Sequence, residues 1–235
     1  MFDHKYDVHL MKALILSAEH AGNQIPAAYA KYFSSTEAQK DLASHRGYDL
    51  GTEDLYNYLC QTTTPVYHCN ELRSRLLIEY NRSENNSNLF SVYSKKLNKE
   101  IRKQLTIEHA MYRKELSVQI AQAIKKHKKV VHIALHSFTP VLDDEARNCD
   151  MGLLYDPQRE LEKIQCHLWK KEIGSQYRVR FNYPYRGTAD GLTTYMRSLF
   201  EKNYIGIELE LNQGLIKEKK FPMELKKLIS YLLHL

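Results

Sequence analysis

The sequence predicts an α/β protein, a three-layer α/β/α sandwich with a mixed, mainly parallel sheet at its centre. Strand-like and helix-like segments alternate along the 235 residues, and this alternation is typical of such sandwiches. Several strand-like segments are apolar enough to be covered on both faces, as the strands of parallel sheets are. No low-complexity linker or internal repeat divides the segments. We therefore expect a single domain that spans residues 1–235.

Seven short segments are rich in aliphatic, β-branched and aromatic residues, which favours strands. They are residues 12–17, 65–69, 74–80, 130–138, 151–155, 177–182 and 204–211. Six other segments favour helix, and these are residues 25–33, 52–61, 92–126, 157–173, 190–202 and 221–234. The longest carries Ile107, Met111, Val118 and Ala121 on one stripe, which predicts the face that packs on the sheet. Residues 101–105 remain open to a separate turn.

The composition favours a soluble protein of the cytoplasm. The hydrophobic share is 43%, yet no apolar stretch approaches the ~20 residues that cross a bilayer. Residues 1–10 are polar and lack the apolar centre of a secretion signal. The four cysteines include no CxxC pair, which argues against a cysteine zinc cluster and against a disulfide framework. We expect a cytoplasmic protein that contacts no membrane.

The charge balance is mildly positive, with a net charge of +6, and attracts anionic ligands. Together with 17 tyrosines it could also indicate a nucleic-acid-binding protein, in which aromatic residues stack on bases and lysines follow phosphates. Such a protein clusters these residues, whereas here they are dispersed and no nucleic-acid motif is present. We therefore expect no nucleic-acid partner and keep this function as the lesser alternative.

Polar and ionisable side chains follow two of the predicted strands and lie towards the carboxyl ends of two others. In open α/β sheets, ligands bind beyond the carboxyl ends of the strands, so these positions are where chemistry is expected. The side chains are Glu19 and His20, Asn81 and Arg82, His136 and Ser137, and Glu208 and Glu210.

The two histidines in this set suit a zinc site. Two imidazoles and a carboxylate form a common zinc set that leaves a fourth position for water, whose acidity the metal raises. His20 and His136 are the natural imidazole pair. A further carboxylate near that water would act as general base and then protonate a leaving amine, and we assign this role to Glu210.

Neighbouring arginine and asparagine residues suit an anionic group of the substrate. Asn81 and Arg82 would hold it through a charge-assisted fork. The loop NYPYRGTADG adds Arg186, which is available to an anion, and Tyr183 or Tyr185 as residues that line the pocket. Together these residues predict hydrolysis of an amide that bears a carboxylate.

Six stretches in this order resemble the N-formylglutamate amidohydrolase family over about residues 13–216: SAEHAGNQIP, HRGYDLG, SRLLIEYNRS, HSFTP, NYPYRG and IELELNQGLI. The resemblance implies a hydrolase fold like that of the zinc carboxypeptidases and aspartoacylases. It implies hydrolysis of N-formyl-L-glutamate, or of a related N-acyl amino acid, to the free amino acid and formate or another small acid. We expect one Zn²⁺ per chain. A relative that has lost catalysis and only binds an acyl amino acid is the alternative.

The resemblance also implies roles for individual residues. His20 matches the first zinc histidine, which ends an early strand, and His136 matches the second. Asn81 and Arg82 match a pair that grips the substrate carboxylate. A glutamate on a late strand serves as base. Glu208 and Glu210 point to the same face of a strand, and Glu210 is preferred because it matches the family's late stretch better in register.

The third zinc ligand departs from the carboxypeptidase pattern. That pattern places a glutamate three residues after the first histidine, where this chain has Asn23, a poor zinc ligand. Asp49 is the preferred substitute, because the formylglutamate group also has an aspartate there. His45 competes with it if the segment is helical, and Glu19 could also ligate. The choice among Asp49, His45 and Glu19 stays open, as do the acyl group and the oligomeric state.

Overall fold

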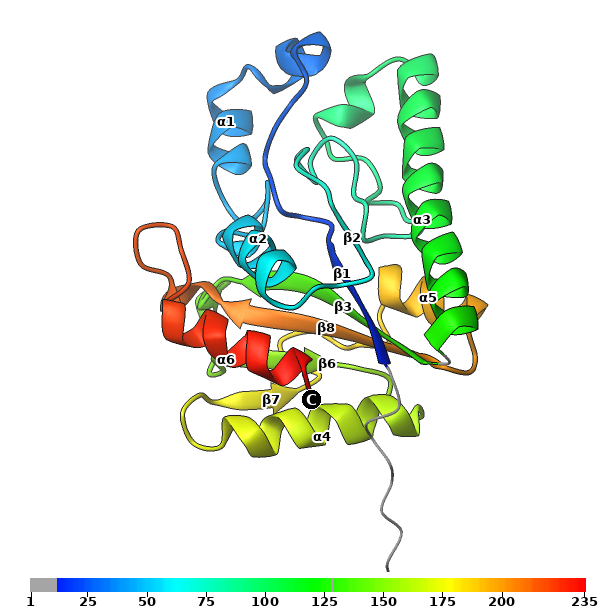
Figure 1. The fold of residues 1–235 in the computed structure, drawn as a ribbon. Coiled ribbons are helices and arrows are strands. Elements are labelled where there is room, and N and C mark those ends of the chain that lie inside the picture. The colour runs from blue at the N-terminus through cyan, green and yellow to red at the C-terminus, as the bar shows by residue number, and fades with distance from the viewer. Residues whose placement is uncertain (1–11, 128) are drawn as a thin grey trace, which may run out of the picture.

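The computed structural model describes residues 12–127 and 129–235 and has the predicted α/β architecture (Figure 1). Residues 1–10, which are expected not to form a secretion signal, lie outside the described residues. In the described part, no helix combines the length and the apolar character that a membrane span requires. The elements in chain order are β1 (Lys12–Ala18), η1 (Ala27–Phe33), α1 (Thr36–Leu42), α2 (Thr52–Thr62), β2 (Tyr67–Asn70), η2 (Ser94–Lys96), α3 (Lys99–His127), β3 (Lys129–Phe138), β4 (Val141–Leu142), β5 (Glu145–Ala146), β6 (Met151–Leu154), α4 (Glu160–Ile173), β7 (Val179–Phe181), α5 (Leu192–Leu199), β8 (Tyr204–Asn212), η3 (Gln213–Leu215) and α6 (Met223–Leu233).

The central sheet of the described residues has six strands in the order β2-β1-β3-β8-β6-β7. β1 runs parallel to β2 and β3, and β3 runs parallel to β8. β6 runs antiparallel to β8 and parallel to β7. The sheet is therefore mixed and mainly parallel, as the sequence predicts. β4 and β5 form a separate antiparallel pair.

Helices cover both faces of this sheet, which gives the predicted three layers (Figure 1). On one face α2, α4 and α6 bury apolar side chains against the sheet, among them Leu59, Trp169 and Ile229. On the other face α3 and α5 pack against a smaller cluster that includes Leu116 and Met196. Alternate side chains of each strand point to opposite faces, so neighbouring positions of one strand belong to different clusters.

Residues 74–80 do not form the predicted strand, because turns at residues 75–77 interrupt the apolar run. Its Leu77, Ile78 and Tyr80 are buried in a separate cluster with Phe33 and Leu105. The run is apolar because it fills the space between η1, α1 and the start of α3. An apolar pattern of this length does not distinguish a strand from a buried irregular segment.

The predicted apolar stripe of the longest helix is wrong. Ile107, Met111 and Val118 are 45%, 63% and 39% exposed, and Ala121 is exposed as well. The opposite stripe is buried instead, and it consists of Leu105, His109, Arg113, Leu116, Ile120 and Ala123. Two of these six residues, His109 and Arg113, are polar. A search for apolar residues at helical spacing therefore identifies the exposed stripe instead of the buried one. Residues 101–105 belong to α3 and form no separate turn.

Two further differences concern short helices. The segment expected at residues 25–33 is the 3-10 helix η1. The helix α1 was not predicted, although Ser35 is a good N-cap and accepts a hydrogen bond from the Ala38 amide at 3.2 Å.

Candidate metal centre and substrate cavity

The carboxyl ends of β1, β3 and β8 meet at one edge of the sheet. In the parallel register, His136 of β3 lies opposite Glu210 of β8, and Ala134 lies opposite Glu208. Glu208 and Glu210 are two residues apart, so both point to the face that α3 and α5 cover. The predicted metal and base residues of these two strands are therefore immediate neighbours.

The turn after β1 brings His20 to the same edge. The Glu71 amide donates to the Ala18 carbonyl, and the Gln24 amide donates to the Leu72 carbonyl, each at 3.0 Å. Gly22 lies so close to this segment that a Cβ atom there would be 2.2 Å from the Leu72 carbonyl oxygen. Only glycine fits at this position, and the turn that it permits buries His20 against the end of β3.

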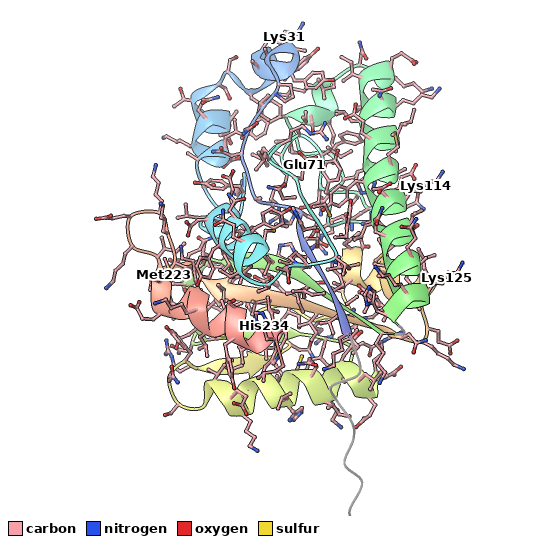
Figure 2. All side chains as sticks on the ribbon, in the orientation of Figure 1. Lys31, Glu71, Lys114, Lys125, Met223 and His234 are labelled. Atoms are coloured by element: carbon pink, nitrogen blue, oxygen red, sulfur yellow. The ribbon has the colours of Figure 1, made fainter. Side chains whose placement is uncertain are left out.

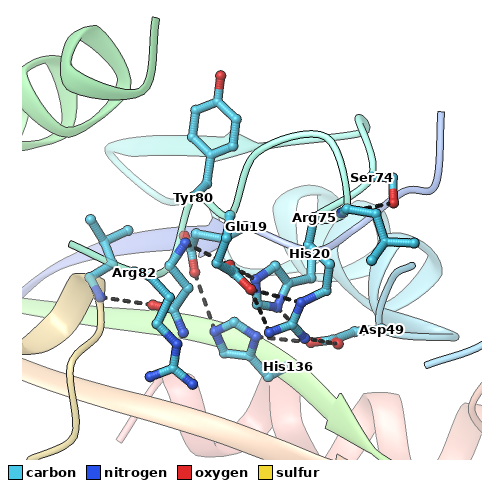
Figure 3. A network of polar contacts seen from close by, with 12 residues as sticks. Glu19, His20, Asp49, Ser74, Arg75, Tyr80, Arg82 and His136 are labelled. Carbon is cyan, nitrogen blue, oxygen red and sulfur yellow. Dashed lines mark hydrogen bonds and ion pairs between the residues drawn. The ribbon is translucent and has the colours of Figure 1, made fainter. Parts of the chain in front are cut away.

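His20, Asp49 and His136 form one buried cluster, in which one ligand atom from each residue lies within 4.8 Å of the others. Nδ1 of His136 is 2.9 Å from Oδ2 of Asp49, and Nδ1 of His20 is 3.4 Å from the same oxygen. The Asp49 amide donates to the His20 carbonyl at 2.9 Å, and Oδ2 accepts from the Ser137 amide at 3.3 Å. Figure 3 shows the three side chains converging from separate segments of the chain.

The other nitrogen of each imidazole faces a second carboxylate. Nε2 of His20 is hydrogen-bonded to Oε1 of Glu79. Nε2 of His136 lies 3.3 Å from Oε2 of Glu19. A carboxylate at Nε2 favours a proton there and leaves the Nδ1 lone pair for a metal, an arrangement typical of metal-ligating histidines. Consistent with this, the buried Nδ1 of His20 has no hydrogen-bond partner among the described residues.

The charges around the cluster suit a divalent cation. Burial opposes ionisation of Glu79, but Arg75 and His20 outweigh it and lower the pKa of this carboxyl below its usual range. Burial is likewise outweighed at Glu19, where His136 lowers the pKa to about 2. Both groups, together with Asp49, are therefore carboxylates at neutral pH. With neutral imidazoles, the three carboxylates exceed the guanidinium of Arg75 by two negative charges, which a divalent cation would balance.

Asp49 is the carboxylate that the fold places between the two histidines. His45 is exposed on the cavity wall, and its segment between α1 and α2 is not helical. Glu19 lies on the far side of the His136 ring and accepts a hydrogen bond from the Tyr112 hydroxyl at 3.1 Å. Asn23 is exposed and donates to the Leu42 carbonyl at 3.0 Å. The geometry therefore favours Asp49 among the three candidates.

A cavity of about 290 Å³ opens onto the cluster. It contains the other residues to which the sequence assigns chemistry, and its walls include Asn81, Arg82, Tyr185, Arg186, Glu208 and Glu210. Tyr183 is not among the lining residues, and its ring stacks on the guanidinium of Arg180 at 3.7 Å. The metal-binding and substrate-binding residues that were inferred separately thus face one space.

The two glutamates of β8 differ in their partners. Oε1 of Glu208 accepts a hydrogen bond from the Thr193 hydroxyl at 2.5 Å. Oε2 of Glu210 is buried and has no hydrogen-bond partner in the described part of the chain. Burial, reinforced by the nearby Asp49 and Glu208 and opposed by His136, raises the pKa of Glu210 to about 8. Glu210 therefore differs from Glu208 in having a carboxyl oxygen without a partner and a raised pKa.

Asn81 and Arg82 are held against the loop that precedes α5. Oδ1 of Asn81 accepts from the Leu192 amide at 2.7 Å, and Nη1 of Arg82 donates to the Asp190 carbonyl at 2.5 Å. Neither Glu79 nor Glu84 pairs with Arg82 among the described residues. Arg186 is exposed and lines the same cavity from this loop.

Arg75 and Glu79 also belong to this cluster, although the sequence pattern does not indicate it. A strand over residues 74–80 would place Arg75 at the end away from Arg82. The turns instead bring Nη2 of Arg75 to 2.6 Å from Oε2 of Glu79, and Nη1 of Arg75 to 3.5 Å from Oδ1 of Asp49. The available signal was a pair of opposite charges four residues apart within the apolar run SRLLIEY.

Comparison with known proteins agrees with this architecture. The fold is similar to the crystal structure of gene product Atu2144 from Agrobacterium tumefaciens, with a TM-score of 0.80 at 22% identity, covering 95% of this chain and 89% of that chain. It is also similar to N-formylglutamate amidohydrolase from Ralstonia eutropha, with a TM-score of 0.69 at 15% identity, covering 94% of this chain and 92% of that chain. At these identities the likeness shows the fold alone. The comparison with curated proteins gives no match. The family model for N-formylglutamate amidohydrolase matches residues 12–217, and the chain therefore belongs to this family.

Proposed function

We propose that this protein is a zinc-dependent amidohydrolase that cleaves N-formyl-L-glutamate or a related N-acyl amino acid. The products are the free amino acid and formate or another small acid. One observation carries the proposal: two imidazoles and a carboxylate converge beside the buried, unpartnered carboxyl of Glu210. A site that only bound an acyl amino acid would not need a carboxyl without a partner at this position.

The metal would be held by Nδ1 of His20, Nδ1 of His136 and the carboxylate of Asp49. A Zn²⁺ ion bound there would lower the pKa of a water molecule and polarise the acyl carbonyl. Glu79 and Glu19 would fix the two rings through their Nε2 atoms, and Arg75 would fix Glu79 and Asp49. This division between ligands and supporting carboxylates follows the contacts described above.

Glu210 would transfer the proton. Its carboxylate takes a proton from the water that adds to the acyl carbon, and its carboxyl returns the proton to the amine as the C–N bond breaks. A general acid and base works best when its pKa is near the working pH, and burial supports such a value for Glu210.

The carboxylate of the substrate would bind Arg82 with Asn81 and Arg186. Because Oδ1 of Asn81 already accepts from the Leu192 amide, its Nδ2 remains available as a donor to an anion. Arg82 uses one nitrogen on the Asp190 carbonyl and keeps the rest of its guanidinium for the substrate. Arg186 would approach from the loop before α5, which lines the same cavity.

The direct test measures acid release from a panel of N-formyl and N-acetyl amino acids, with N-formyl-L-glutamate as the reference. The protein is assayed as purified, after chelation, and after zinc is added back. We expect hydrolysis that the chelator abolishes and zinc restores. Turnover by the fully chelated protein would contradict the proposed metal dependence. Zinc-loaded protein that binds an acyl amino acid but releases no acid would identify a binder instead.

A further inference from the structure

Arg113 is a buried arginine that the proposed mechanism does not use. It lies on the sheet-facing side of α3 and is 5% exposed. No carboxylate forms an ion pair with it among the residues described. A buried charge without a counter-ion is costly, so it is retained only where other contacts compensate for it.

The contacts of Arg113 are concentrated on the segment that carries Asn81 and Arg82. Its Nη2 donates to the Arg82 carbonyl at 2.5 Å and lies 3.5 Å from the Tyr80 carbonyl. Its guanidinium also lies over the ring of Tyr195 on α5, 4.9 Å from the ring centroid. The planar guanidinium therefore binds two carbonyls and stacks on an aromatic ring at once, which lysine could not do.

His109, one turn earlier on α3, supports the same carbonyl. Its Nε2 is 2.9 Å from the Arg82 carbonyl oxygen and 3.3 Å from Nε of Arg113. This nitrogen either donates to the carbonyl or accepts from the guanidinium, and both arrangements tie Arg82 to α3.

The next residues of the segment are held from the other side. The Ser83 amide donates to both carboxylate oxygens of Asp190 at 3.1 Å, and Nδ2 of Asn86 donates to Oδ2 at 2.7 Å. The irregular backbone at residues 80–86 is thus fixed between α3 and the loop before α5. It has no sheet hydrogen bonds to hold it in place.

We propose that Arg113 is a positioning residue, which fixes the backbone at residues 80–82 so that Asn81 and Arg82 reach the carboxylate of the substrate. The inference rests on the proposed function for its effect on catalysis, but its effect on the backbone does not. Arg113 makes no hydrogen bond or ion pair with His20, Asp49 or His136. The segment that it fixes touches the metal site at one point, where the Asn81 amide donates to Oε1 of Glu79 at 3.0 Å. Glu79 is also held by Arg75, so we expect zinc binding to persist when Arg113 is replaced. Anchoring of a remote carboxylate contributes similarly in the ground state and the transition state, and its loss therefore acts mainly on KM.

The test compares Arg113→Gln and Arg113→Lys with Lys114→Gln as the matched control. Lys114 is the next residue of α3 and is exposed (Figure 2). For Arg113→Gln we expect amide hydrogen exchange at residues 81–83 to be about tenfold faster than in the wild type. We expect KM to rise about tenfold, with kcat and zinc content nearly unchanged. Arg113→Lys should show a smaller rise in both quantities, and Lys114→Gln should match the wild type.

Two readouts separate the inference from the proposed function. A folded Arg113→Gln protein with wild-type exchange at residues 81–83 and wild-type KM would overturn the inference. If the wild type hydrolyses no N-acyl amino acid, the proposed function fails, and exchange at residues 81–83 alone decides the positioning role. If Arg113→Gln does not fold, Arg113→Lys decides it, with wild-type exchange at these amides as the contrary result.

Discussion

The strand β3 carries two histidines four residues apart on the same face, and their environments differ. His132 lies in the middle of the strand, where its ring nitrogens contact the Ser17 hydroxyl at 2.8 Å and the Tyr204 hydroxyl at 2.7 Å. His136 lies near the carboxyl end, where its nitrogens face the carboxylates of Asp49 and Glu19. Burial lowers the pKa of His132 to about 4. At His136 the effect of burial is outweighed by Asp49 and Glu19, which raise the pKa well above its ordinary value.

The difference shows how position along one strand separates a structural histidine from a candidate ligand. Hydroxyl partners occupy both nitrogens of His132 and leave no lone pair for a metal, so this residue stabilises the core. Carboxylate partners surround His136 because the strand ends where the turn after β1 and the loop before α2 meet. A histidine near the end of a parallel strand can be reached by such loops, whereas one in the middle cannot.

The largest expected effect separates these two histidines. His136→Ala removes a proposed ligand, so we expect little bound zinc and a loss of turnover of at least about a thousandfold. His132→Gln should keep its zinc and most of its turnover. Metal analysis of the purified variants and assays of acid release measure both. Retained metal and turnover in His136→Ala would contradict the assignment of His136.

A second comparison concerns the two glutamates opposite β3. Glu210→Gln cannot accept a proton, so we expect kcat to fall by about 100- to 10,000-fold while zinc is retained. Glu208 is bound to Thr193, and Glu208→Gln should keep most of its turnover. Zinc content and kcat of both variants are measured in parallel. Equal losses in the two variants would show that Glu210 has no special role.

A third substitution concerns Glu79, which is hydrogen-bonded to the proposed ligand His20. Glu79→Gln weakens the contact that orients His20, and we expect zinc affinity to fall by about 10- to 100-fold. Competition with a chromophoric chelator gives the dissociation constant. Glu84→Gln, at an exposed position on the same segment, is the control and should bind zinc as the wild type does. Unchanged affinity in Glu79→Gln would mean that Glu79 does not support His20.

His132→Gln has the smallest expected effect on turnover, and its main effect is on the pH dependence of the free energy of unfolding. The folded pKa of about 4 lies below the ordinary value of 6.5, so the unfolded chain binds more protons between these values. Acidification from pH 6.5 to pH 4 should therefore lower the free energy of unfolding by up to about 3 kcal/mol through this group. Urea denaturation at several pH values should show a shallower pH dependence for His132→Gln than for the wild type. Parallel profiles would contradict a neutral, buried His132.

Part of the site was predictable because it follows apolar strands directly. β1, β3 and β8 are long apolar runs, and each is followed by or ends with an ionisable residue that has no place in a core. Their parallel arrangement brings His20, His136 and Glu210 together by geometry alone. The fold class followed from the same alternation of segments.

The rest depends on contacts that a local pattern does not contain. Asp49 lies in an irregular loop, and only the family resemblance favoured it over His45 and Glu19. Arg75 and Glu79 meet because turns interrupt an apolar run that has the composition of a strand. The burial of Arg113 could not be predicted from the sequence, because a helix face that contains a charged residue does not match the apolar pattern of a buried face. Its partners are backbone carbonyls some 30 residues earlier in the chain.

The central claim is that His20, Asp49 and His136 hold one divalent cation. A crystal structure of the zinc-loaded protein, with anomalous data collected at the zinc absorption edge, tests it most directly. We predict one anomalous peak per chain at about 2.0–2.2 Å from Nδ1 of both histidines and from an Asp49 carboxylate oxygen. A zinc peak held by other residues, with both Nδ1 atoms free of metal, would contradict the account.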